Sequence, residues 1–116
     1  MDIKRINPTP RWSDITVFNH TAYFVEVADD STADIESQIK QVFQQTERSL
    51  ASVGSDLSSL LSVTIYLTDL AHLGLFNQLW EAWLPEGKAP SRACINAQLA
   101  DPSLLVEITV VAAILP

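Results

Sequence analysis

The sequence has one cysteine, two histidines and few basic residues. The single cysteine, Cys94, excludes an internal disulfide and fits a reducing compartment. Seven basic residues against fourteen acidic ones leave a formal net charge of −7. This charge disfavours binding to nucleic acid and to an anionic membrane surface, because both depend on Lys and Arg. His20 and His72 stand apart from each other and from Cys94, so the sequence predicts no metal site.

Long apolar runs are also missing from the sequence. The most apolar stretch, LLVEITVVAAILP, is too short for a membrane-spanning helix and is interrupted by Glu107. The first residues, MDIKRINPTP, contain no apolar segment typical of a signal peptide. We therefore expect a cytoplasmic protein. A chain of 116 residues is long enough for a single domain with one core, over residues 1–116.

Hydrophobic periodicity predicts five strands and two helices in the order β-β-α-β-α-β-β. The predicted strands are Ile15–Phe18, Ala22–Ala28, Leu60–Leu67, Arg92–Leu99 and Leu105–Ile114. A long amphipathic helix is expected between the second and third of these strands. Asp30, Ser31 and Thr32 are capping candidates at its start, and Gly54 can end it. The second predicted helix is Asp69–Leu84, which Pro85 stops. This order predicts an α+β domain with both helices on one face of a single sheet.

The strand patterns leave the second face of that sheet unusually apolar. In the stretches Leu60–Leu67 and Leu105–Ile114, both sets of alternating residues are largely apolar or amphipathic. A sheet with one solvated face is expected to alternate more clearly between apolar and polar residues. We therefore predict a homo-oligomer that buries this face; the alternative is a surface that is simply rather apolar.

Arg92 stands at the head of a predicted strand, two residues before Cys94. Alternation along the strand places Arg92, Cys94 and Asn96 on one face and Ala93, Ile95, Ala97 and Leu99 under the helices. A hairpin turning near Asp101–Pro102 would set Glu107 opposite Asn96, on the same face as Arg92.

This predicted arrangement has two interpretations. Arg92 and Glu107 could form a structural or intersubunit ion pair. Alternatively, Arg92 binds an anion, because its planar guanidinium grips a carboxylate with two hydrogen bonds. Glu107 would then move a proton or orient a water molecule.

The stretch APSRACINAQL followed by VEITVVAAI resembles the C-terminal signature of the RidA (YjgF) family of imine and enamine deaminases. That signature has a Pro-x-Arg-x-Cys strand followed by a strand with Glu between branched apolar residues. The segment VTIYLTDLAHLGLFNQLWEAW resembles the family's strand–helix unit, so the resemblance extends over nearly the whole chain. RWSD, WEAW and the short length are most similar to the YoaB-like branch.

This resemblance implies a chorismate-mutase-like α+β fold, a homotrimer with clefts at subunit interfaces, and cofactor-free hydrolysis of 2-imino or 2-enamino acids. Arg92 would bind the substrate carboxylate, Glu107 would orient or activate water, and Cys94 would contribute main-chain groups. Trp12 falls where the family has an aromatic cleft wall, and Asn77 where it often has a cleft-lining Asn. From the residues alone, the sequence favours an incidental Cys94 thiol over a nucleophile, and Asn77 could equally be an exposed helix residue.

One position departs from the family pattern. The deaminating relatives carry a pocket-lining Ser next to a Gly in the second strand, where this chain has Val25 and Glu26. The pocket thus loses a hydroxyl and gains an apolar wall. A second hypothesis therefore stays open: a non-catalytic trimer that binds a small carboxylate such as a 2-oxo acid. Glu107 discriminates between the two, because a hydrolase needs it and a carboxylate binder does not.

Overall fold

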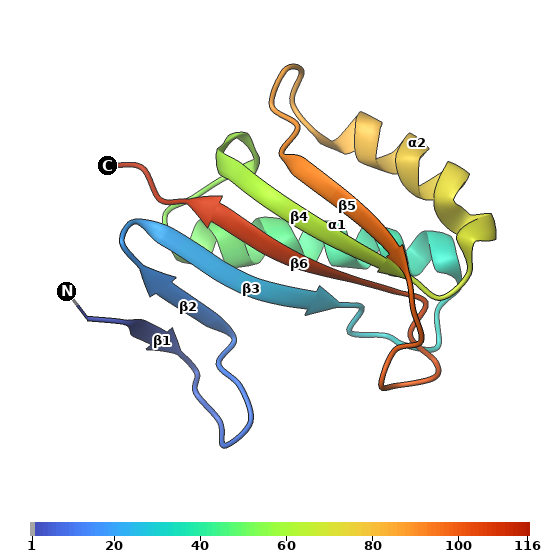
Figure 1. Ribbon diagram of the computed structural model, residues 1–116, viewed down its shortest axis with the longest axis horizontal. Coiled ribbons are helices and arrows are strands. Elements are labelled where there is room, and N and C mark those ends of the chain that lie inside the picture. The colour runs from blue at the N-terminus through green and yellow to red at the C-terminus, as the bar shows by residue number, and fades with distance from the viewer. Residues whose placement is uncertain (1) are drawn as a thin grey trace.

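The computed structural model describes residues 2–116 as a twisted six-stranded sheet covered on one face by two helices (Figure 1). The strand order is β1-β2-β3-β6-β4-β5, and only β4 and β5 are parallel. The strands are β1 (Lys4–Ile6), β2 (Ile15–Phe18), β3 (Thr21–Val27), β4 (Leu60–Leu67), β5 (Ser91–Asn96) and β6 (Val106–Ala113). The helices are α1 (Ile35–Ser52) and α2 (Leu73–Trp83). The predicted α+β class and the two-helix layer are confirmed.

The first three strands form an antiparallel meander. Asn19 and His20 take positive φ angles of 53° and 58°, the geometry of a tight two-residue hairpin turn between β2 and β3. The short strand β1, which pairs with β2 in the register Lys4↔Val17, was not predicted, because three residues are too few to show a period.

Asp residues cap the start of α1 and the 3-10 turn that precedes α2. The side chain of Asp34 accepts a hydrogen bond from the Ser37 backbone N–H (2.9 Å), so α1 starts there. The predicted caps at positions 30–32 are wrong, because Asp30 instead accepts hydrogen bonds from Thr32 within its own turn. Asp69 caps the 3-10 turn that precedes α2, and Gly54, with φ of 77°, follows the end of α1 as predicted.

The core lies between the helices and the central strands. Alternate residues of β3, β4 and β6 face the helices and are buried: Ala22 and Phe24; Val63, Ile65 and Leu67; Val106, Ile108, Val110 and Ala112. The helices contribute Ile39, Val42, Phe43, Phe76 and Trp80. No helix within residues 2–116 combines the length and apolarity needed to span a membrane.

The predicted hairpin between the last two strands is wrong. β5 pairs in parallel with β4, and β6 lies on the other side of β4, antiparallel to both β3 and β4. The reason is the crossover through α2: a helix joining two neighbouring strands brings the chain back in the same direction. Residues 97–105 then carry the chain past β4 to the middle of the sheet.

This topology reverses the predicted faces of β5. Arg92 pairs with the buried Val63 and lies on the helix side. Ile95, expected under the helices, lies on the open face and is 43% exposed. Glu107 pairs with Tyr66 and Val27, also on the open face. Arg92 and Glu107 of one chain therefore lie on opposite faces of the sheet, and the predicted shared face is wrong.

Candidate functional site

The guanidinium of Arg92 lies against α2. Its central carbon is 5.4 Å from the ring centre of Trp80 and 5.8 Å from that of Phe76. One terminal N–H donates to the side-chain oxygen of Asn77. No carboxylate within residues 2–116 forms an ion pair with Arg92, and its side chain is exposed. A cation with four remaining N–H donors is thus open to an incoming anion.

Cys94 lies on the same side of β5 as Arg92, as alternation predicted. The residue is half-buried and packs against the core, and its thiol is free. β5 is the last strand of the sheet, so alternate N–H and C=O groups of its main chain face outward without a strand partner. The structure thus brings together three predicted site residues: Arg92, Asn77 and Cys94.

The remaining predicted site residues surround a separate cavity of about 530 Å³. Glu107 lines it at the start of β6, together with Trp12 from the N-terminal loop and Val25 from β3. The other lining residues are Ser13, Asp14, Val27, Ala100, Asp101 and Leu104. One wall is apolar and the other carries oxygen atoms, as expected for a small-molecule pocket.

The charged residues that line this cavity are all acidic. Asp14, Asp101 and Glu107 line it, and no Lys, Arg or His does. Two hydrogen bonds lower the pKa of Asp101: the larger effect comes from the Ser103 hydroxyl and the smaller from the Ser103 backbone N–H. This carboxylate therefore stays ionised. A single chain therefore presents a carboxylate-rich cavity that repels an anion.

Local hydrogen bonds hold the cavity walls in place. The Trp12 indole N–H donates to Asp14 (3.3 Å), and the Trp12 backbone N–H donates to the Thr9 hydroxyl (3.1 Å). On the other side, the amide of fully buried Gln38 donates to the Ser103 carbonyl (3.1 Å) and accepts from the Leu105 N–H (2.9 Å). Gln38 thus fixes the 97–105 loop to α1. The sequence alone did not indicate this role, because it shows only a polar residue on the apolar side of the helix.

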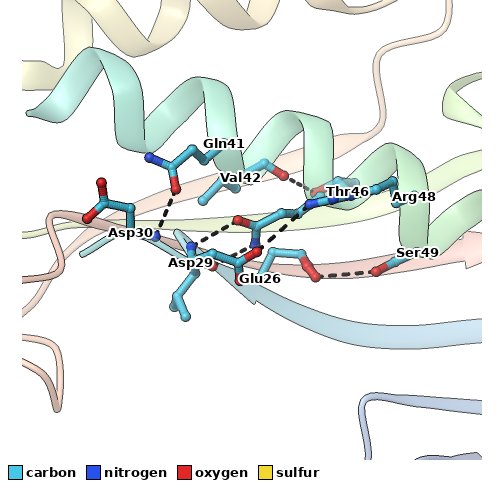
Figure 2. A network of polar contacts seen from close by, with 10 residues as sticks. Glu26, Asp29, Asp30, Gln41, Val42, Thr46, Arg48 and Ser49 are labelled. Atoms are coloured by element: carbon cyan, nitrogen blue, oxygen red, sulfur yellow. Dashed lines mark hydrogen bonds and ion pairs between the residues drawn. The ribbon is translucent and has the colours of Figure 1, made fainter. Parts of the chain in front are cut away.

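Glu26, next to Val25, points the other way. Its side chain lies on the helix face of β3, where one carboxylate oxygen accepts from the Ser49 hydroxyl (3.3 Å) (Figure 2). The second oxygen is buried without a partner, and burial raises the pKa of Glu26. Gln45 joins the same strand end to α1 by bonds to the Val27 carbonyl and the Asp29 N–H. Glu26 therefore belongs to the β3–α1 packing rather than to the cavity of Glu107.

The candidate site is thus split into two parts. We call Arg92, Asn77 and Cys94 the arginine half-site, and Trp12, Val25 and Glu107 the glutamate half-site. Sequence analysis missed the two aromatic residues beneath Arg92, although Trp80 is one helical turn after Asn77. Within residues 2–116, no cluster of His, Cys, Asp and Glu has the arrangement of a metal site.

The sequence and the fold are similar to those of known proteins over nearly the whole chain. A family model described as "Endoribonuclease L-PSP" matches residues 3–114. The RutC family protein YoaB of Escherichia coli is 38% identical over 114 residues, which cover 98% of this chain and 100% of that protein. A RutC family protein of Haemophilus ducreyi is also 38% identical, over 97% of each chain.

Solved structures show the same fold. An uncharacterised protein from Pseudomonas aeruginosa superimposes with a TM-score of 0.93 at 42% identity, covering 97% of this chain and 98% of that one. A member of the YjgF protein family from Neisseria meningitidis also gives 0.93, at 34% identity, with coverage of 100% and 98%.

These matches define an α+β domain of the chorismate-mutase-like fold, as predicted. The chain belongs to the RidA (YjgF) family. Membership supports a general role in imine or enamine deamination or in small-molecule binding.

Proposed function

We propose that this protein hydrolyses 2-imino acids and their 2-enamino tautomers to 2-oxo acids and ammonia, without a cofactor. One observation carries the proposal. Within residues 2–116, Arg92 forms no ion pair with a carboxylate, and no cationic residue lines the cavity of Glu107. The two groups lie on opposite faces of the same sheet. Each half-site lacks the group that the other presents. The complete site then forms where the arginine half-site of one copy meets the glutamate half-site of another.

A closed oligomer supplies such a meeting. In a cyclic trimer each interface joins two different patches of the same chain. Members of this family are typically trimers, and the open sheet face here exposes Tyr23 (44%), Val25 (54%) and Ile95 (43%). An apolar face of this kind favours burial against other copies. The proposed assembly is therefore a homotrimer with interfacial sites.

The chemistry assigns a role to each charged group. Arg92 binds the substrate carboxylate through two in-plane N–H donors. A water oxygen bonds to the C=N carbon while Glu107 accepts the water proton, and the nitrogen takes up a proton. The carbinolamine then collapses to the 2-oxo acid and releases ammonia. Such imines already hydrolyse in water, so positioning of the reactants supplies much of the acceleration.

The other residues shape the pocket. Asn77 holds Arg92, and the main chain around Cys94 offers unpaired polar groups at the sheet edge. Trp12 and Val25 form the apolar wall beside Glu107. The wall makes a second function worth testing, namely a trimer that binds a small 2-oxo acid without turning it over. RNA cleavage is disfavoured, since the net charge of −7 opposes phosphate binding.

The direct test generates imino acids with an amino-acid oxidase and traps the remainder with semicarbazide. We expect the wild type to lower semicarbazone formation and Arg92→Ala to leave it unchanged. A wild type that is inactive across a panel of amino acids would remove the deaminase proposal.

Glu107→Gln separates the two candidate functions. For a deaminase, turnover falls by about 10²–10⁴-fold, while a 2-oxo acid binds as well as before or better, because a negative charge has been removed. The binding function predicts unchanged binding with no turnover in either protein.

A further inference from the structure

We propose that Trp80, together with Phe76, is a positioning residue that fixes the plane of the Arg92 guanidinium for carboxylate binding. The inference rests on the proposed role of Arg92 as the carboxylate-binding group. It adds two residues that touch neither the substrate nor water and act only through Arg92.

The rings beneath Arg92 form a rigid support. Trp80 is 4% exposed and Phe76 is fully buried. Their ring centres are 5.7 Å apart, and Phe43 from α1 packs on both, at 5.6 Å from Phe76 and 6.2 Å from Trp80. The support therefore belongs to the α1–α2 packing and cannot shift on its own.

The support leaves the binding edge of the guanidinium free. Both ring centres lie within cation–π range of the Arg92 carbon, at 5.4 Å and 5.8 Å. Asn77 accepts from one terminal nitrogen. The cation–π contacts use none of the N–H donors, whereas a carboxylate binds through those donors, so both interactions can exist together.

This arrangement has a consequence for affinity. An arginine on an edge strand would otherwise sample many rotamers and lose that freedom when the ligand binds. The contacts with Trp80 and Phe76 and the bond to Asn77 restrict it beforehand. Preorganisation of this kind strengthens binding without any new contact to the ligand.

The competing explanation is that Trp80 is an ordinary core residue. Trp83 provides a matched control, because it belongs to the same helix and the same aromatic cluster. It stacks on Phe43 at 4.0 Å and lies 5.8 Å from Trp80. Within residues 2–116, the cation–π contacts of Arg92 involve Phe76 and Trp80 and do not include Trp83.

The experiment titrates 2-oxobutanoate into the intact oligomer by calorimetry, for wild type, Arg92→Ala, and the Leu and Phe variants at positions 80 and 83. We expect Trp80→Leu to weaken binding between about twofold and thirtyfold, and Trp80→Phe, which keeps an aromatic face, to weaken it by about twofold. The variants at position 83 should bind like the wild type even where their melting temperature falls. If Trp80→Leu does not assemble, the Phe variants at the two positions still give the comparison.

The outcomes separate this inference from the proposed function. If Arg92→Ala loses binding but the Trp80 variants bind like the wild type, only the positioning role is overturned. Equal weakening at positions 80 and 83 overturns it too, because general loss of aromatic packing then explains the effect. If Arg92→Ala binds like the wild type, Arg92 is not the carboxylate-binding group and the proposed function fails first.

Discussion

The arginine half-site and the glutamate half-site are built in different ways. Arg92 lies on an edge strand, but buried aromatic residues of α2 support it. Glu107 lies on a central strand, and two loops fixed by Thr9, Asp14 and Gln38 enclose its cavity. The first half-site has a cation without a carboxylate, and the second has carboxylates without a cation. The difference teaches that neither half-site of a single chain can hold an anionic substrate beside a proton acceptor.

The largest expected effect comes from mixing two inactive variants. Arg92→Ala and Glu107→Gln should each lose imine hydrolysis when pure. If the half-sites meet between copies, mixed oligomers contain some sites with both wild-type groups. Random mixing at equal amounts gives about a quarter of all sites both groups. We therefore expect about a quarter of wild-type activity after co-expression or joint refolding, measured by semicarbazide trapping.

A matched control for this mixing uses the double variant. Arg92→Ala mixed with Arg92→Ala/Glu107→Gln contains no wild-type arginine half-site and should stay inactive. Mass spectrometry would verify that both chains share one oligomer. Verified mixed oligomers without recovered activity would contradict a site shared between copies.

The sequence predicted the elements of the fold better than it predicted their placement. Helix α2 and the grouping of Arg92 with Cys94 follow from local periodicity. Alternation says which residues of a strand share a face, but not which face meets the helices. That choice for β5 depended on its neighbour, β4, which the crossover through α2 selects.

Local sequence patterns also could not predict which residues contact the site residues. Trp80 is an apolar helix residue, and only the structure shows that its ring lies 5.4 Å from the Arg92 carbon. Gln38 joins α1 to a loop 65 residues further along the chain. Such contacts arise from tertiary structure, and no spacing within one helix reports them.

A smaller effect is expected from the apolar wall of the glutamate half-site. Val25→Ser removes apolar surface and adds a hydroxyl at the cavity that Trp12 and Glu107 also line. We expect the ratio of kcat/KM for the leucine-derived imine over the alanine-derived imine to fall by about tenfold. Competition between the two imines in one trapping assay measures this ratio directly.

Thr109→Ser offers a control for Val25→Ser on the same open face. Thr109 pairs with Val25 but does not line the cavity of Glu107. This substitution should leave the preference unchanged. An unchanged ratio for Val25→Ser as well would mean that Val25 does not contact the substrate side chain.

The smallest expected effect separates the two glutamates near the second half-site. Burial raises the pKa of Glu26 above its ordinary value of 4.5. The folded state therefore binds this proton more tightly than the unfolded state, and the stability that it contributes is fully present below the unfolded pKa and is lost as pH rises through the folded pKa. Glu26→Gln does not titrate, so it should unfold at a melting temperature a few degrees above the wild type at neutral pH.

This advantage of Glu26→Gln should shrink as the pH is lowered to about 4, where Glu26 of the wild type also becomes neutral. Melting curves across this pH range measure the difference. They are recorded at one protein concentration, because oligomers melt in a concentration-dependent way.

Imine hydrolysis by Glu26→Gln should stay at the wild-type level, since Glu26 faces Ser49 of α1 (Figure 2). Glu107→Gln should show the opposite result for hydrolysis, with activity lost. A difference between Glu26→Gln and wild type that does not change with pH would show that the buried charge does not limit stability. A loss of hydrolysis in Glu26→Gln would instead move this carboxylate into the site, and the division between a structural and a catalytic glutamate would fail.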